Sequence, residues 1–158
     1  MFDEMNMTNL NLPPINCKIT EIEGKNQIFD IIRKKNIVLT PEEWVRQHVV
    51  HLLIHQLGFS KSLIKVEGGL SYHGMAKRSD IVVFDQQAKP YLLIECKAPE
   101  VKLDRKTISQ ASIYNKTLDA PFVAISNGLK TYCFEMGVNG ASSVQMKGFP
   151  EPPTAVKQ

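Results

Sequence analysis

The sequence predicts an α/β domain, in which a mixed central sheet is flanked by helices and preceded by an N-terminal β-hairpin. Two observations lead to this fold class. Segments after Thr40 and Asp104 carry apolar residues at helical spacing, whereas the other apolar runs are short and bounded by turn residues. The expected order is therefore a hairpin, a helix, three strands, a second helix and two strands.

The chain is expected to form one domain. Its 158 residues can bury a core of ordinary size, and 43% hydrophobic with 22% charged residues is usual for a soluble globular protein. Residues 1–15, rich in Asn and Met, are expected to be a loose arm. The domain spans 16–136, and the Gly-, Ser- and Pro-rich residues 137–158 are expected to be a loose tail.

Charge and cysteine content narrow the function classes. A formal net charge of +3 permits a phosphate-bearing partner but does not by itself indicate one. The three cysteines are widely spaced without a CxxC pair, so reduced thiols are expected and not a zinc or iron–sulfur site. Because neither a long apolar stretch nor a signal pattern occurs, we expect a cytoplasmic protein without membrane contact.

The N-terminal hairpin is expected from Cys17–Ile22 and Gln27–Arg33, which flank the turn segment Glu23–Asn26. A short basic run, Arg33–Lys35, closes it. This run is interpreted as solvated surface, with a phosphate contact as the alternative.

The first helix should begin at Thr40. Thr40 is a good N-cap, Pro41 suits the first helical position, and Glu43 can close a capping box. Gly58 should end the helix. The stripe expected to pack on the core is Val45, Val49, Leu52 and Leu53.

Three histidines follow on this helix, at His48, His51 and His55. His51 and His55 have the i, i+4 spacing of zinc ligands, but the glutamate of an HExxH motif is missing. Partly exposed helix histidines are therefore preferred over a zinc-dependent hydrolase.

A strand is expected from Leu63 to Tyr72, with a bulge or bend at Gly68-Gly69. Glu67 is expected at the surface, with an extra acid near the site as the alternative. Arg78 either pairs with Asp80 or contacts a substrate phosphate.

The next hairpin joins Asp80–Phe84 to Tyr91–Ala98. Alternation along the second strand places Tyr91, Leu93, Glu95 and Lys97 on one face. A loop centred between Gln87 and Ala88 would set Asp80 opposite Glu95, with Cβ atoms about 4.5–5.5 Å apart. Two opposed buried carboxylates repel, and a divalent cation such as Mg²⁺ removes the conflict.

The second helix is expected from Asp104 to Leu118, packed through Thr107, Ala111, Tyr114 and Leu118. From the residues alone, we expect Tyr114 to be a core aromatic with its hydroxyl at the rim and Gln110 to be solvated. A buried strand, Pro121–Ser126, follows. Asn127-Gly128 predicts a type I′ turn into a returning strand, Leu129–Glu135.

The spacing of Asp80, Glu95 and Lys97, D-x14-E-x-K, resembles the signature of the PD-(D/E)xK nuclease superfamily, with Ser79 in place of the proline. More narrowly, the chain is similar to the N-terminal endonuclease domain of type I restriction enzyme R subunits and its stand-alone relatives. The blocks that carry this resemblance are TPEEWVRQ at Thr40–Gln47, RSDIVV at Arg78–Val83, IECKAPEVKL at Ile94–Leu103, Gln110-x-x-x-Tyr114-Asn115 and Ser126-Asn127-Gly128.

The resemblance implies a restriction-endonuclease-like fold and a metal-dependent endonuclease that hydrolyses DNA. It implies Mg²⁺ or Mn²⁺ held by Asp80, Glu95 and the Cys96 carbonyl, with Lys97 orienting the attacking water or stabilising the transition state. It further implies that Glu43 reaches the metal site directly or through water. The same resemblance places Gln110 and Tyr114 beside the active site.

Other restriction-modification subunits are the expected protein partners, beside DNA. The chain contains no G-x-x-x-x-G-K-[ST] loop, so the ATP-driven motor of an R subunit is not expected in it. The alternative is a nuclease-like module that binds nucleic acid or a partner without cutting. The presence of all three signature residues favours cleavage.

Overall fold

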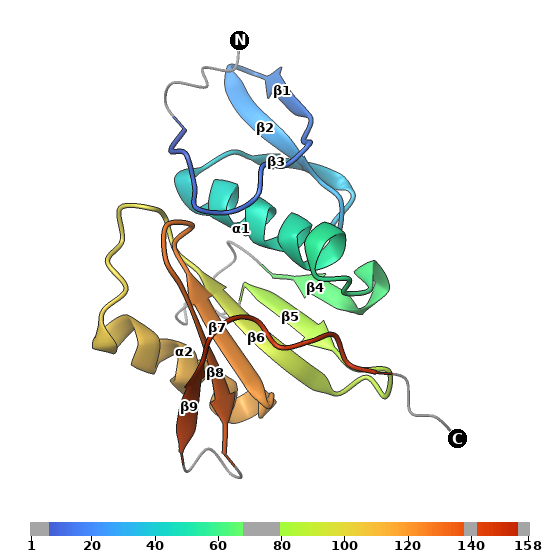
Figure 1. Ribbon diagram of the computed structural model, residues 1–158. Coiled ribbons are helices and arrows are strands. Elements are labelled where there is room, and N and C mark those ends of the chain that lie inside the picture. Colours follow the sequence, from blue (N-terminus) through green and yellow to red (C-terminus); the bar gives the residue numbers. More distant parts are fainter. Residues whose placement is uncertain (1–6, 68–79, 138–141, 155–158) are drawn as a thin grey trace.

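A six-stranded mixed sheet is the centre of the fold (Figure 1). The computed structural model describes residues 7–67, 80–137 and 142–154. In order across the sheet, the strands are β4 (Ile64–Val66), β5 (Ile81–Phe84), β6 (Pro90–Cys96), β7 (Phe122–Ser126), β8 (Thr131–Met136) and β9 (Ser143–Met146). Neighbours are antiparallel except β6 and β7, which are parallel and joined by the helix α2 (Arg105–Leu118). The predicted α/β class with a mixed sheet is confirmed.

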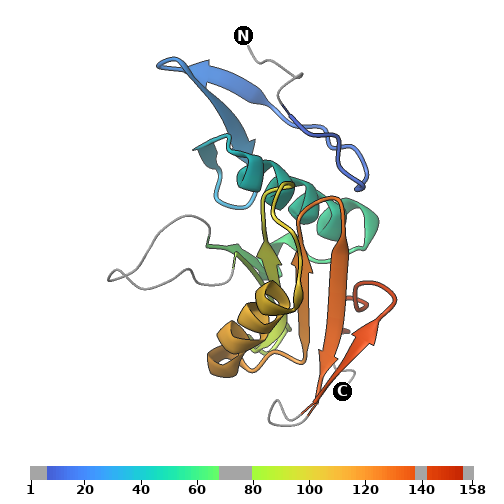
Figure 2. The ribbon, with the colours of Figure 1, turned by 90° about the vertical axis from the view of Figure 1, so that its left-hand side faces the viewer.

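Each face of the sheet carries a helix and its own apolar core. Helix α1 (Pro41–His51) packs on the face that includes Ile81, Val83 and Ile94, which we call the α1-side core. Helix α2 covers the face that includes Leu93 and Val123, the α2-side core, and lies in front of the sheet in Figure 2. Residues alternate between the two cores along β5 and β6, as the strand pattern predicts.

Helix α1 begins as expected, because Thr40 Oγ accepts a hydrogen bond from the Glu43 N–H at 3.0 Å. After His51 the chain continues as a π-helical turn, Leu52–Gln56, and Gly58 follows with φ +79°. Val45, Val49 and Leu53 are buried as predicted, but Leu52 is only half-buried and Val50 is in the core instead. The helix lies between two sheets, so it buries a wider face than one stripe (Figure 1).

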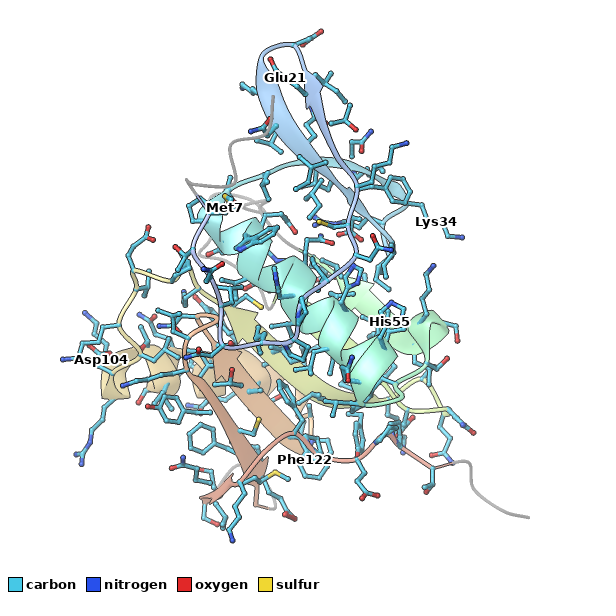
Figure 3. All side chains as sticks on the ribbon, turned by 45° about the horizontal axis from the view of Figure 1, so that its top comes forward. Met7, Glu21, Lys34, His55, Asp104 and Phe122 are labelled. Carbon is cyan, nitrogen blue, oxygen red and sulfur yellow. The ribbon has the colours of Figure 1, made fainter. Side chains whose placement is uncertain are left out.

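The second sheet has three strands, β1 (Ile19–Ile22), β2 (Lys25–Asp30) and β3 (Lys35–Val38). The predicted hairpin is confirmed, and its turn residues Glu23 and Gly24 both have positive φ, as a type I′ turn requires. Strand β3 is not among the expected strands, because it begins inside the basic run. Lys34 and Lys35 are exposed as expected, and Lys34 extends away from the sheet in Figure 3.

The β5–β6 hairpin has the predicted register, since Ile81 pairs with Ile94 and Val83 with Leu92. The register then shifts at Phe84, and Tyr91 is the extra residue of a bulge. Tyr91 consequently packs against the α1-side core and the ring of Phe122, with centroids 5.1 Å apart. The expectation that Tyr91 shares a face with Leu93 is therefore wrong.

The β7–β8 connection is not the predicted two-residue turn. Ser126 pairs with Thr131, and Asn127 has no positive φ. The Asn127 Oδ1 atom instead accepts from the backbone N–H groups of Leu129 and Lys130 at 3.0 and 2.9 Å. An Asx-type turn thus replaces the type I′ turn.

The N-terminal segment is not loose where the structure describes it. Leu10 and Leu12 pack against the α1-side core, and the Trp44 Nε1–H donates to the Thr8 carbonyl at 3.0 Å. Gly128 has φ +83°, which side chains rarely adopt, and a Cβ there would also lie 2.7 Å from a Leu10 methyl carbon. This segment passes over α1 in Figure 1.

The C-terminal segment also differs from the expected loose tail. Strand β9 pairs with β8, and Met146 and Phe149 pack against the α1-side core. The Tyr91 hydroxyl donates to the Glu151 carbonyl at 2.5 Å. Isolated apolar residues in a polar, Pro-rich stretch anchor it, and composition alone does not indicate that.

The remaining expectations concern β4 and α2. Strand β4 ends at Val66, while Gly68-Gly69 and Arg78 lie outside the described residues. Helix α2 begins where predicted, since the Asp104 carboxylate accepts from the Thr107 N–H at 3.0 Å.

Within the described ranges, no helix has the length and apolar character that crossing a membrane requires.

Candidate active site

The predicted acids lie at the end of the β5–β6 strand pair. Asp80 directly precedes β5, and the pairing of Ile81 with Ile94 places it level with Glu95 on β6. Asp80 and Glu95 are each only 1% exposed. The Lys97 Nζ atom lies 3.5 Å from Glu95 Oε1. The three residues of the D-x14-E-x-K pattern therefore meet at one end of the sheet.

Both oxygens of the Asp80 carboxylate accept hydrogen bonds. Oδ2 accepts from the Cys96 backbone N–H at 2.6 Å, and Oδ1 accepts from Arg46 Nη2 at 2.9 Å. Burial raises the pKa of Asp80, and the Arg46 charge and the Cys96 N–H offset only part of this. Among the residues that the structure describes, Arg46 is the cation beside Asp80, while Arg78 lies outside them.

Arg46 projects from α1 and is only 2% exposed. Its Nη1 donates to Glu43 Oε1 at 2.7 Å, and its Nη2 also donates to Glu42 Oε2 at 2.9 Å. Burial acts to lower the pKa of Arg46, but the carboxylates of Asp80 and Glu43 outweigh it and raise that pKa. One guanidinium therefore joins three carboxylates.

Glu43 belongs to this network as well as to the helix start. Its backbone N–H is capped by Thr40, while its carboxylate is buried and also accepts from Arg33 and Gln47, each at 2.9 Å. Only the Thr40 half of the predicted capping box forms, because the Glu43 carboxylate accepts from Arg33, Arg46 and Gln47 and not from the Thr40 N–H.

The network continues to the three-stranded sheet through Asp30. Arg33 Nε donates to Asp30 Oδ2 at 2.7 Å, and Gln47 Nε2 donates to the same oxygen at 3.0 Å. Burial acts to raise the pKa of Asp30, but the hydrogen bonds from Arg33 and Gln47 prevail and lower it. The Arg33 side chain is 16% exposed, so the expectation of a solvated residue is wrong at this position.

The donor set suits a divalent cation. The carboxylates of the network belong to Asp30, Glu42, Glu43 and Asp80, and its cations to Arg33 and Arg46; Glu95 and Lys97 form an ion pair of their own. Carboxylates outnumber cations, and hard oxygen donors are what Mg²⁺ prefers. In the described ranges, no three His, Cys, Asp or Glu residues form a ready-made metal cluster. A Mg²⁺ ion commonly keeps several waters and takes only one or two carboxylates, so Asp80 and Glu95 fit such an ion.

Gln110 and Tyr114 lie on α2. Gln110 is exposed, and Tyr114 is half-buried against the α2-side core. Both placements agree with the simpler interpretation, and neither residue has a described contact with Lys97. Sequence analysis missed Arg46 and Gln47 as site residues, although both stand in the TPEEWVRQ block.

The histidines form a separate region. His48 and His51 are each 6% exposed, so the expectation of partly exposed side chains is wrong for both. Burial lowers the pKa of each. His51 and His55 line a cavity of about 520 Å³ together with Pro13, Pro14 and Lys61. None of the predicted catalytic residues lines this cavity.

Comparison with known proteins shows the family of the chain. The family model of the type I restriction enzyme R protein N terminus (HSDR_N) matches residues 41–150, a range that includes Asp80, Glu95 and Lys97. The chain belongs to this family. Among solved structures, one described as a fragment of an HsdR subunit of a type I restriction enzyme from Vibrio vulnificus YJ016 has a TM-score of 0.50 at 19% identity.

That structural match covers 72% of this chain and 24% of the other. At this level of identity it shows a shared fold and nothing more. Comparison with curated protein sequences finds no match. The HSDR_N membership and the fold together support the predicted resemblance to the nuclease domain of R subunits.

Proposed function

We propose that this HSDR_N protein is a metal-dependent endonuclease that hydrolyses phosphodiester bonds in DNA. The observation that carries the proposal is the pair of buried acids, Asp80 and Glu95, level with each other at one sheet end, with Lys97 3.5 Å from Glu95. Buried carboxylates are costly unless they are neutralised; Arg46 pairs with Asp80 and Lys97 with Glu95 in the metal-free chain, and a divalent cation held by both acids would neutralise them together.

In this proposal Asp80, Glu95 and the Cys96 carbonyl hold Mg²⁺ or Mn²⁺. Glu43 acts on the same site through Arg46, or through water. The ion, when bound, activates water and neutralises charge on the scissile phosphate.

Lys97 has the position of the second catalytic group. Its side chain is 19% exposed, so its ammonium is within reach of a substrate that approaches the sheet end. A cation there orients the attacking water or stabilises charge that develops on the phosphate. Gln110 and Tyr114 help to place the nucleic acid from α2.

DNA is the proposed substrate, and other restriction-modification subunits are the proposed partners. The described cysteines are free thiols, which suits the cytoplasm. A second function is a nuclease-like module that binds DNA or a partner without cutting. The contact of Asp80 with Arg46 favours it, because a neutralised acid has less need of a metal.

The test is cleavage of supercoiled, linear and single-stranded DNA with Mg²⁺, Mn²⁺ or EDTA. We expect metal-dependent cleavage that falls about a hundredfold or more in Asp80→Ala, Glu95→Ala and Lys97→Ala. Lys89→Ala, in the exposed β5–β6 loop, is the matched control and should retain activity. Cleavage that persists in EDTA would refute the proposal. Metal-independent DNA binding without cleavage would support the second function.

A further inference from the structure

We propose that Arg46 is an internal counter-ion, which pairs with Asp80 in the metal-free protein and competes with the metal ion for that carboxylate. The inference rests on the proposed metal site, and it adds which residue stabilises that site when no metal is bound. It predicts that the cation paired with Asp80 weakens metal binding rather than supporting it.

The metal-free site needs a cation. Asp80 is 1% and Glu43 is 4% exposed, and carboxylates so deeply buried are strongly destabilising unless paired. Arg46 supplies the charge to both of them, at 2.9 and 2.7 Å. Lys97 lies against Glu95 instead. An arginine suits the position, because its planar fork serves several carboxylates at once.

The orientation of Asp80 does not depend on Arg46. The Cys96 N–H holds Asp80 Oδ2 at 2.6 Å, and this backbone donor is fixed by the sheet. Arg46 adds a positive charge beside the other oxygen, Oδ1. Like charges repel strongly in a buried site, so a divalent ion at Asp80 must work against Arg46.

Arg46 also contacts two other carboxylates, which can still pair with it when it moves away from Asp80. Its Nη2 is shared between Asp80 and Glu42, and its Nη1 stays with Glu43. Arg33 binds Glu43 from the other side at 2.9 Å and so fixes that acceptor. A small movement of the guanidinium toward Glu42, which is 22% exposed, therefore frees Asp80 without stranding a buried charge.

The test is calorimetric titration of Mn²⁺ into the whole chain, comparing wild type with Arg46→Gln and Arg46→Lys. We expect Arg46→Gln to bind Mn²⁺ about tenfold or more tightly, with a lower melting temperature in EDTA. Arg46→Lys keeps the charge and should remain within about threefold of wild type. Equal or weaker binding by Arg46→Gln would overturn the proposal.

A second measurement does not depend on how well Arg46→Gln folds. In wild-type protein carrying ¹⁵N-labelled arginine, the Arg46 guanidinium signals are identified by their loss in Arg46→Lys. We expect them to shift when Mg²⁺ saturates the site, and unchanged signals would overturn the counter-ion. Metal binding that is absent, or unaffected by Asp80→Asn, would refute the proposed metal site itself.

Discussion

Replacing Asp80 with asparagine should destabilise the metal-free protein. The hairpin register taken alone predicts the opposite, because Asp80→Asn relieves repulsion with Glu95 and should then stabilise by about 1 kcal/mol. The structure reverses the sign. Arg46 donates to Asp80 at 2.9 Å, and both side chains are almost fully buried, so the substitution removes one partner of an ion pair.

The size of the effect follows from the hydrogen bonds that the substitution weakens. A hydrogen bond to a charged group contributes about 1.5–3 kcal/mol, and asparagine cannot accept from both Arg46 and the Cys96 N–H as well as a carboxylate does. Stranding a buried ion costs about 3–5 kcal/mol, but Arg46 keeps Glu42 and Glu43. Less repulsion returns up to about 1 kcal/mol. We expect a net loss of about 2 kcal/mol, or about 4–8 °C in melting temperature.

The assay is thermal and urea unfolding in EDTA at neutral pH. The matched control is Asp119→Asn, since Asp119 is exposed with φ 53°, a conformation that asparagine also tolerates. The control should stay within about 0.5 kcal/mol of wild type. A melting temperature for Asp80→Asn at or above that of wild type would refute Arg46 as the counter-ion of Asp80.

Three further predictions concern stability. Glu43→Gln should lower the free energy of unfolding by about 2 kcal/mol, because two arginines lose a buried partner; a urea titration showing almost no change would leave Glu43 with its cap role alone. As the pH is lowered from about 7.5 to about 5.5, the free energy of unfolding should fall. The pKa values of His48 and His51 are lowered in the folded protein, so the unfolded chain takes up protons first. His51→Gln should flatten that pH dependence, and an identical slope in both proteins would contradict it. Phe149→Ala should cost about 2 kcal/mol in thermal melts, since Phe149 packs on the α1-side core; a truly loose tail would show no effect.

The features that the sequence predicts well are local. The Thr40 cap depends on residues within one helical turn, and the β5–β6 register depends on a short loop. Alternation along one short strand then places Glu95 and Lys97 together, and the hairpin register adds Asp80, without any knowledge of the rest of the chain. The position of the two acids and the lysine at one end of the sheet is predictable for this reason.

The features that it misses depend on residues far apart in the chain. Arg46 and Asp80 are separated by 34 positions, and no periodicity connects them. The anchoring of Leu10 and Phe149 depends on core surface that exists only after folding. The bulge at Tyr91 is a third case, because one extra residue changes the face on which a side chain lies.

The central claim is that Asp80 and Glu95 together bind one divalent metal ion. Calorimetric titration of Mn²⁺ into wild type, Asp80→Asn and Glu95→Gln tests it directly, with circular dichroism to establish that each variant is folded. We predict saturable binding by wild type and affinity at least about tenfold weaker in both variants. Wild-type affinity in either folded variant would contradict the claim.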